Sequence, residues 1–297
     1  MQRGDSTRPF DGAFPFESGD ADPSGDCGER RRLDRRLPDP EGLRAFNVHP
    51  DLTDLPEEQP VSIEINGHPV GILLCTPENL AELAAGWIFG HGFVNRVEEL
   101  RSIMPHGNRV AVMIDAPGPG GAAWQIILGG GFDARHLAVP RIADLGLAPL
   151  PGNASTSAWS IRTDQFLERV SKAFDLMRGD RGAGGFHHGT AITGTNVEPP
   201  IRDVSRHNAV DNVVGRLLLR SSACDQVILC LSGRVTADIV LKGWRAGIPV
   251  IASRVLPTLE AVELAHAAGV TLIGRVLDQR RTIYTHVWRL TPADEIE

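Results

Sequence analysis

Two short segments in the C-terminal half combine arginine with hydroxyl side chains, and together they could bind an anion. They are Ser232-Gly233-Arg234 and Ser253-Arg254-Val255-Leu256-Pro257-Thr258. Each follows an apolar run that predicts a strand and precedes a pattern that predicts a helix. Helix N-termini favour negative charge, and arginine adds a bidentate geometry that suits phosphate. Either segment alone is more typical of a polar turn with capping Ser and Thr, but the pair predicts a phosphate-binding site.

Two histidine clusters could line the same site. The stretch Gly184-Gly185-Phe186-His187-His188-Gly189 is rich in small residues and predicts a loop whose backbone can approach a ligand, and Arg206-His207-Asn208 opens a predicted helix. Zinc is a second use for histidine, but no Cys or acidic residue follows at ligand spacing. The HxE and PCxxC pattern of zinc deaminases is also absent from the sequence. We therefore expect a pocket for a phosphate-bearing small molecule, without a metal held by the protein.

The four cysteines do not form a disulfide framework. Cys27, Cys75, Cys224 and Cys230 show neither close, even spacing nor a CxxC pair, which favours a reducing compartment. Cys75 ends one apolar strand and Cys230 lies inside another, so we expect both to be buried structural residues. Cys224 stands in a polar turn, where a thiol could be exposed.

Composition excludes two classes of partner. Of the 297 residues, 42% are hydrophobic, which is enough for a sizeable core, and the formal net charge is −7. A chain without a basic excess is a poor candidate for nucleic-acid binding. No apolar run approaches the roughly 18 residues that a membrane span needs. We expect a cytoplasmic protein with no membrane partner.

The first half of the chain predicts a tail followed by an α+β domain. Residues 1–42 are rich in Asp, Arg, Gly, Pro and Ser without a hydrophobic period, as in a disordered tail, and the α+β domain is expected over residues 43–150. Within it, Asn66-Gly67 between two alternating strands predicts a hairpin. Thr76-Pro77-Glu78 predicts a helix start with Thr76 as the N-cap. A second strand pair is expected over 108–128, and a loop and connection over 129–152.

The second half, residues 151–297, has the rhythm of an α/β domain. Helices are expected to begin at Thr163, ending at Gly179, and at Arg206. Three continuous apolar runs then alternate with two helical patterns. The runs are 227–231, 248–252 and 270–274, and the helical patterns are 235–246 and 258–268. This alternation predicts a parallel sheet that is covered on both faces, closed by a last strand that ends at Tyr284-Thr285-His286.

Several motifs, in this order, make the chain similar to the FdhD/NarQ family of formate dehydrogenase accessory proteins. The resemblance covers roughly residues 58–290 and rests on Asn66-Gly67, Cys75-Thr76-Pro77, Leu83-Ala84-Ala85-Gly86, Gly184-Gly185-Phe186-His187, Asp203 to Asp211, Ser232-Gly233-Arg234-Val235, Ala246 to Val250, Ser253-Arg254 with Pro257-Thr258, and Tyr284-Thr285-His286.

This resemblance implies a fold and a function. The fold would be a cytidine-deaminase-like three-layer domain, and the protein would be a homodimer. Family members take sulfur as a persulfide on a CxxC cysteine from a cysteine desulfurase. They pass it to the bis(molybdopterin guanine dinucleotide) cofactor of formate dehydrogenase, which contains molybdenum or tungsten. The residues expected to contact that cofactor, or to line its pocket, are His187, Arg206, His207, Arg234, Ile251, Ala252, Ser253, Arg254, Val255 and Leu256.

The chain departs from the family at the sulfur site. Ser157 and Ser160 stand where the family has its two cysteines. A serine hydroxyl neither holds sulfane sulfur nor ionises near neutral pH, so the usual relay cannot run through this segment. Near the predicted helix start, Arg202 replaces a family acid, and Asn212 replaces a family lysine.

Three hypotheses follow from this departure. The first is an accessory protein that binds the cofactor and has lost sulfur transfer. The second is a sulfurtransferase that uses Cys75 or Cys224 instead. The third is a non-catalytic dimerisation or chaperone partner of a molybdoenzyme or of an active family member.

Overall fold

A computed structural model describes residues 55–115, 127–128, 157–180 and 184–293. These residues contain three β-sheets and five α-helices. The mixed α/β class is therefore confirmed. In these ranges, every helix is too short or too polar to cross a membrane. The predicted tail, the predicted connection over 129–152 and Cys27 lie outside the described residues. The predicted domain boundary at residue 150 also lies there and stays a prediction.

The predicted hairpin is confirmed as β1 (Gln59–Ile65) and β2 (His68–Cys75), which pair antiparallel. The turn residues Asn66 and Gly67 have φ values of 51° and 84°. Both values are positive, as a tight two-residue hairpin turn requires, and Asn and Gly accept them at little cost. Alternate residues of β1 are buried, so one face of the hairpin packs on the core.

The second strand pair begins earlier than predicted. It consists of β3 (Leu100–His106) and β4 (Arg109–Ile114), and β5 (Ile127–Leu128) joins the other edge of the same sheet, in the order β3-β4-β1-β2-β5. The prediction of a pair over 108–128 was wrong because Gly107, with φ of 56°, allows the turn just before that range.

The first helix also differs from its prediction at the start. Helix α1 spans Leu80–Gly90, and its N-cap position is Asn79 in the left-handed conformation. Thr76 does not cap it. The Thr76 hydroxyl instead accepts a hydrogen bond from the Val204 N–H at 3.2 Å, so it links the end of β2 to a segment far along the chain.

The large sheet has the strand order β13-β12-β11-β10-β7-β8, with β9 paired to β7. Its strands are β7 (His187–Thr193), β8 (Asn196–Val197), β9 (Ile201–Asp203), β10 (Val227–Leu231), β11 (Val250–Ser253), β12 (Thr271–Gly274) and β13 (Thr282–Ile283). The three predicted apolar strands, β10 to β12, are parallel as expected. Strands β7 and β13 are antiparallel to their neighbours, so the sheet is mixed. His187 and His188, predicted in a loop, begin β7.

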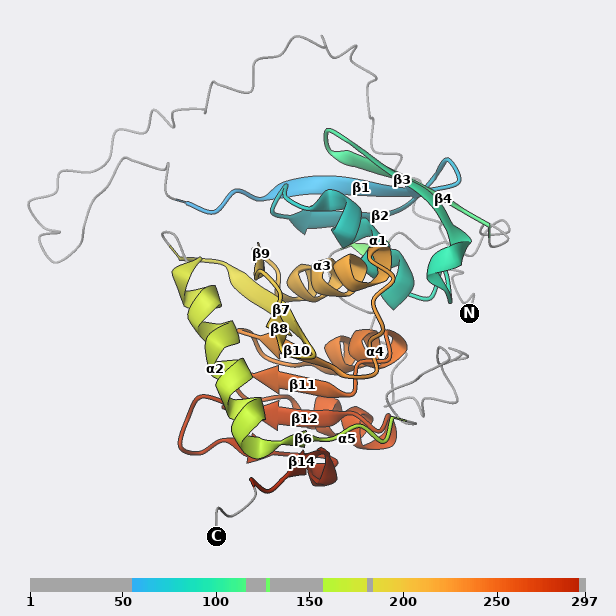
Figure 1. The fold of residues 1–297 in the computed structure, drawn as a ribbon. Coiled ribbons are helices and arrows are strands. Elements are labelled where there is room, and N and C mark those ends of the chain that lie inside the picture. The colour runs from blue at the N-terminus through green and yellow to red at the C-terminus, as the bar shows by residue number, and fades with distance from the viewer. Residues whose placement is uncertain (1–54, 116–126, 129–156, 181–183, 294–297) are drawn as a thin grey trace, which may run out of the picture. The chain divides into compact units, whose positions relative to one another are not determined.

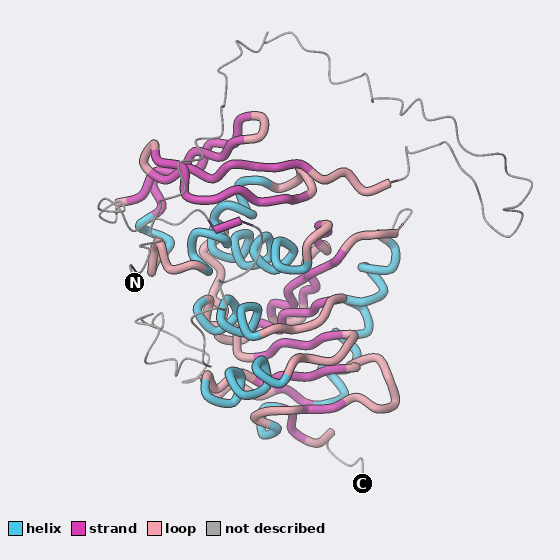
Figure 2. The backbone as a smooth tube through the Cα atoms, turned by 180° about the vertical axis from the view of Figure 1, so that it is seen from behind, coloured by secondary structure: helices cyan, strands magenta, loops and turns pink. Residues whose placement is uncertain are grey.

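Helices cover both faces of this sheet, as Figures 1 and 2 show. The helices are α2 (Thr163–Gly179), α3 (Arg206–Leu219), α4 (Ala237–Arg245) and α5 (Leu259–Ala267), close to their predicted ranges. Helix α2 buries Phe166 and Val170 against the face that carries Ile228 and Val250. Helices α3 to α5 pack on the opposite face in a larger core shared with α1 and the first sheet.

Short elements complete the described chain. A two-stranded parallel sheet joins β6 (Ile161–Arg162) to β14 (Leu290–Thr291), next to the start of α2. Single turns of 3₁₀ helix lie at Val97–Glu99 and Val287–Arg289. The parallel pair therefore ties the beginning of the second half to the C-terminal end of the described chain.

Helices α1 and α3 cross with their backbones in direct contact. A Cβ atom on Gly86 would lie 1.8 Å from the carbonyl oxygen of Asp211, and one on Gly215 would lie 1.8 Å from that of Glu82. No side chain can occupy either position without a shift of the helix axis. Gly86 and Gly215 thus set the distance between α1, which packs on the first sheet, and α3, which packs on the large sheet.

Candidate functional site

Four segments bring predicted site residues to one edge of the large sheet. Strands β10 and β11 are parallel, and their last residues, Leu231 and Ser253, are register partners. Strand β7 runs the opposite way, with Gly189 opposite Leu231, so His187 begins β7 at this same edge. Helix α3 also starts here, because β9 pairs with β7 through Asp203 and His187.

The loop after β10 touches the start of β7 and the start of α3. A Cβ atom on Gly233 would lie 3.0 Å from Nδ1 of His187 and 3.1 Å from Cβ of Arg206. This glycine therefore allows three segments to approach closely. We call the group the carboxyl-edge site. Its members are His187, Arg206, His207, Arg234, Arg254, Val255 and Leu256.

Ser253 connects the two arginine-bearing loops rather than facing solvent. Its hydroxyl donates to the Gly233 carbonyl oxygen at 2.8 Å and accepts from the Val255 N–H at 3.1 Å. The residue is fully buried. The Arg254 N–H adds a hydrogen bond to the Leu231 carbonyl at 3.1 Å. The Ser253 hydroxyl thus links the loops that carry Arg234 and Arg254, and contact between Ser253 and a ligand stays a prediction.

The rest of the predicted segment 251–256 divides into a buried part and an exposed part. The side chains of Ile251 and Ala252 are fully buried, one in each of the two cores. Arg254 is exposed, and Val255 and Leu256 are 39% and 40% exposed. The side chains of residues 254–256 can therefore contact a ligand. Those of Ile251 and Ala252 pack inside the protein and anchor the strand that precedes the loop.

The carboxyl-edge site is rich in arginine. Arg234 and Arg254 are exposed and form no ion pair with the described residues. The Nε atom of Arg206 is buried and has no hydrogen-bond partner there. Helices α3, α4 and α5 all begin at this edge, and their N-terminal N–H groups add positive potential. Three arginines, from the start of α3 and from the loops after β10 and β11, therefore lie at this edge.

His187 contributes a neutral imidazole. Burial lowers its pKa below the ordinary value, and the positive charges of Arg206, His207 and His188 lower it further. A neutral ring can either donate or accept a hydrogen bond at the pocket wall, depending on its tautomer.

His207 belongs to a hydrogen-bonded chain that the sequence did not reveal. Its Nδ1 lies 2.5 Å from Oδ2 of Asp238, and the other oxygen of Asp238 accepts from the Thr236 hydroxyl. Burial would raise the pKa of Asp238, but the hydrogen bond and charge of His207, with smaller contributions from Lys242 and Thr236, lower the pKa to about 2. Asp238 is therefore an anion at neutral pH. The available sequence signal was only an acid in the first turn of a helix, which is common at helix N-termini.

Ser157 and Ser160 lie away from the carboxyl-edge site. The Ser157 hydroxyl donates to the Asp225 carbonyl at 2.9 Å, and Asp225 precedes the first residue of β10. Ser157 therefore lies at the opposite edge of the sheet from Gly233. With a rise of about 3.3 Å per residue, strand β10 alone, Val227–Leu231, separates the two ends by roughly 13 Å. Arg289 holds the segment in place by donating to the Ser157 carbonyl at 3.0 Å, and Ser160 is exposed.

None of the three thiols in the described part of the chain resembles a reactive cysteine. Cys75 and Cys230 are buried as predicted, and Cys224 is half-buried. Burial raises the pKa of Cys75 and Cys224 to about 12 in each case, assisted by nearby carboxylates, and it raises that of Cys230 as well. A thiol with such a pKa holds almost no thiolate at neutral pH.

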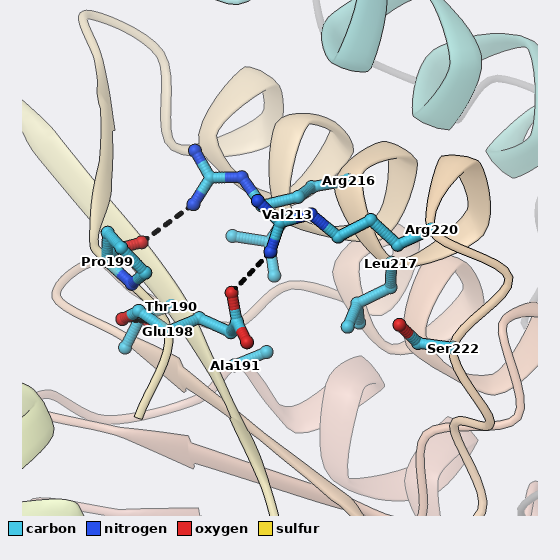
Figure 3. A pocket seen from close by; sticks show the side chains of 9 residues that line it. All are labelled: Thr190, Ala191, Glu198, Pro199, Val213, Arg216, Leu217, Arg220 and Ser222. Atoms are coloured by element: carbon cyan, nitrogen blue, oxygen red, sulfur yellow. Dashed lines mark hydrogen bonds and ion pairs between the residues drawn. The ribbon is translucent and has the colours of Figure 1, made fainter. Parts of the chain in front are cut away.

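A separate small pocket lies between β7 and the C-terminal half of α3 (Figure 3). Its two arginines already have partners within the protein. Arg216 donates to the Pro199 carbonyl at 2.8 Å, and Arg220 donates to the Glu198 carboxylate at 2.6 Å. These bonds fasten the strand connection to the helix, and both guanidinium groups are engaged within the protein. Among the described residues, no cluster of His, Cys, Asp and Glu could hold a metal ion.

Comparison with known proteins agrees with this architecture. The sulfur carrier protein FdhD of Streptomyces avermitilis is 31% identical over 265 residues, which cover 83% of this chain and 91% of the relative. The protein of the same name from Methanothermobacter thermautotrophicus is 29% identical over 255 residues, or 83% of this chain and 96% of the relative. The crystal structure of a formate dehydrogenase accessory protein from Desulfotalea psychrophila superposes with a TM-score of 0.63 and 26% identity, covering 79% of this chain and 90% of that one. The model of the FdhD/NarQ family matches residues 56–291, and the chain belongs to this family.

Proposed function

We propose that this protein is an accessory factor for formate dehydrogenase that binds the bis(molybdopterin guanine dinucleotide) cofactor at the carboxyl-edge site without carrying sulfur itself. The observation that supports this proposal most directly is the convergence of Arg206, Arg234 and Arg254 at one sheet edge, where three helices begin. The relatives named above are a formate dehydrogenase accessory protein and sulfur carriers.

The side chains present suit the anionic part of such a ligand. Two exposed guanidinium groups can bind a pyrophosphate in bidentate fashion, and the buried Nε of Arg206 is a donor without a partner among the described residues. The exposed side chains of Val255 and Leu256 offer apolar surface beside them, as a ring system would require. These residues would bind and orient the ligand, and no covalent role is assigned to them.

Loss of sulfur transfer is proposed from the chemistry of the side chains. By the resemblance to the family, Ser157 and Ser160 stand at its cysteine positions, and the described thiols are buried or half-buried with raised pKa values. Sulfur transfer through Cys75 or Cys224 would require a thiolate that these surroundings disfavour. The hypothesis of a displaced catalytic cysteine therefore has less support than the hypothesis of a cofactor-binding protein.

Calorimetric titration with guanosine diphosphate, which carries the guanine and pyrophosphate parts of the cofactor, tests the proposal. We expect saturable binding that weakens at least about tenfold in the Arg234→Ala/Arg254→Ala double variant, since each lost charge-assisted contact costs about 1.5–3 kcal/mol. Arg96→Ala is the matched control, because Arg96 is an exposed arginine in the other half of the fold.

The result that would refute cofactor binding is equal affinity, or equal absence of binding, in the wild-type protein and the double variant. That result would favour the non-catalytic partner hypothesis, in which the protein assists a molybdoenzyme or an active family member by protein contacts alone. Such a complex would survive substitution of every cysteine and of both arginines.

A further inference from the structure

The bond between His207 and Asp238 joins the first turn of α3 to the first turn of α4. The two side chains are only 14% and 13% exposed, so the contact is largely shielded from water. Thr236, the N-cap residue of α4, donates its hydroxyl to the other oxygen of Asp238. Both carboxylate oxygens are thereby occupied, and the carboxylate cannot rotate away from the imidazole.

This arrangement determines which ring nitrogen of His207 is left without a partner in the hydrogen-bonded chain of Thr236, Asp238 and His207. Nδ1 is used by Asp238, and a carboxylate partner keeps a proton on Nδ1. Among the described residues, Asp238 is the hydrogen-bond partner of the His207 ring, so Nε2 remains for another molecule. His207 directly follows Arg206, and its charge influences the ring of His187 across the site.

We propose that Asp238 is a positioning residue that holds His207 so that Nε2 hydrogen-bonds a phosphate oxygen of the ligand in the carboxyl-edge site. The inference rests on the proposed function and extends it by assigning a specific atom to the phosphate. A fixed ring costs little ordering entropy when the ligand binds. In the complex the ring would donate from both nitrogens, with Nδ1–H bonded to Asp238 and Nε2–H bonded to the phosphate oxygen. Arg206 and His207 would then contact the phosphate from consecutive positions of α3.

A purely structural role for His207 would depend on the other ring nitrogen. If the bond to Asp238 serves only to tie α3 to α4, the important atom is Nδ1. If the ring also binds phosphate, Nε2 is essential for affinity. Asparagine places its amide near the position of Nδ1, whereas glutamine places its amide near the position of Nε2. The two amide variants therefore separate the two roles.

The experiment measures guanosine diphosphate affinity and thermal stability for the wild type, His207→Asn, His207→Gln and Asp238→Ala. We expect His207→Gln to bind within about threefold of the wild type and His207→Asn to lose about tenfold or more. Stability should follow the reverse order, with His207→Asn the more stable of the two. Asp238→Ala should lose affinity although His207 is intact, and ¹⁵N spectra of the histidine should report loss of the hydrogen bond at Nδ1.

The outcomes separate this inference from the proposed function. Equal affinity in the two amide variants, or tighter binding by His207→Asn, would overturn the role of Nε2 while the arginine result still stands. If the wild type does not bind guanosine diphosphate at all, the proposed function and this inference fall together. If Asp238→Ala does not fold, the order of the two amide variants still decides the matter.

Discussion

Gly86 in α1 and Gly215 in α3 lie against each other's helix backbones with no room for a side chain. A Cβ atom on either residue would lie 1.8 Å from a carbonyl oxygen of the opposite helix. This crossing packs α1 and the first sheet against the helix that begins at the carboxyl-edge site. The position of Arg206 and His207 therefore depends on a contact between two glycines.

Alanine at Gly86 or Gly215 should destabilise the protein strongly. An overlap of this size cannot be relieved by side-chain rotation, so the helices must separate, at a cost of about 3 kcal/mol or more. Urea unfolding measures the loss. Gly179→Ala is the matched control, because a Cβ atom there meets nothing within 4 Å, and we expect it to leave stability unchanged or slightly raised. Unchanged stability of both Gly86→Ala and Gly215→Ala would show that the helices are not in backbone contact.

The buried ion pair between Lys242 and Asp211 should be costly to break from one side. The ammonium donates to Oδ2 of Asp211 at 2.6 Å, and both side chains are almost completely buried. Lys242→Met leaves an unpaired buried carboxylate, and we expect a loss of about 3–5 kcal/mol in the free energy of unfolding. The double variant Lys242→Met/Asp211→Asn removes that charge and should recover part of the loss. A single variant as stable as the wild type would contradict the buried pairing.

Asp203 should make stability depend on pH in a defined window. Burial raises its pKa to about 6, although its carboxylate accepts hydrogen bonds from Ser205, Asn208 and Thr76. Between its unfolded value near 3.8 and this folded value, the native state binds more protons than the unfolded state. This contribution is therefore fully present below about pH 4 and is lost as pH rises through about 6, by roughly 3 kcal/mol in all.

The measurement is the difference in unfolding free energy between the wild type and Asp203→Asn from pH 4 to 7. The subtraction is needed because burial lowers the pKa of His91 to about 3, which gives stability the opposite slope over part of the same range. The amide that this substitution introduces cannot titrate, so the wild type should lose stability relative to the variant as pH rises. A difference that does not change with pH would refute a raised pKa for Asp203.

Cysteines placed at positions 157 and 160 should enable the protein to accept sulfur. Both residues lie in a segment that is half-buried or exposed, so a thiol there can ionise more easily than Cys75 or Cys224. We expect the Ser157→Cys/Ser160→Cys variant, in a Cys27→Ser background, to gain a reducible mass of about 32 Da after incubation with a cysteine desulfurase and cysteine.

The matched control for this gain is the Cys27→Ser protein with both serines intact, which should show no change in mass. A gain of sulfur in that control, mapped to Cys75 or Cys224, would instead support the displaced-cysteine hypothesis. Intact-mass and peptide-mass spectrometry distinguish the two results.

Local patterns in the sequence determined most of the second half of the fold. Helices α2 to α5 and strands β10 to β12 follow from apolar periodicity, because each such element buries a face that its own residues specify. The convergence of Arg234 and Arg254 followed as well, since parallel strands end at the same edge of a sheet. The hairpin at Asn66-Gly67 could be predicted because its turn needs two positive φ angles, which Asn and Gly adopt readily.

Contacts between distant residues decided the rest. Thr76 stands in a sequence typical of a helix N-cap, yet its hydroxyl accepts a hydrogen bond from the Val204 N–H, and α1 begins only at Leu80. Asp238 has the sequence of an ordinary first-turn acid, yet it holds His207, 31 positions away. Ser157 was placed at the edge opposite Gly233 by its hydrogen bond to Asp225. Hydrogen bonds and ion pairs across such separations depend on how whole elements pack, and a local pattern carries no information about that packing.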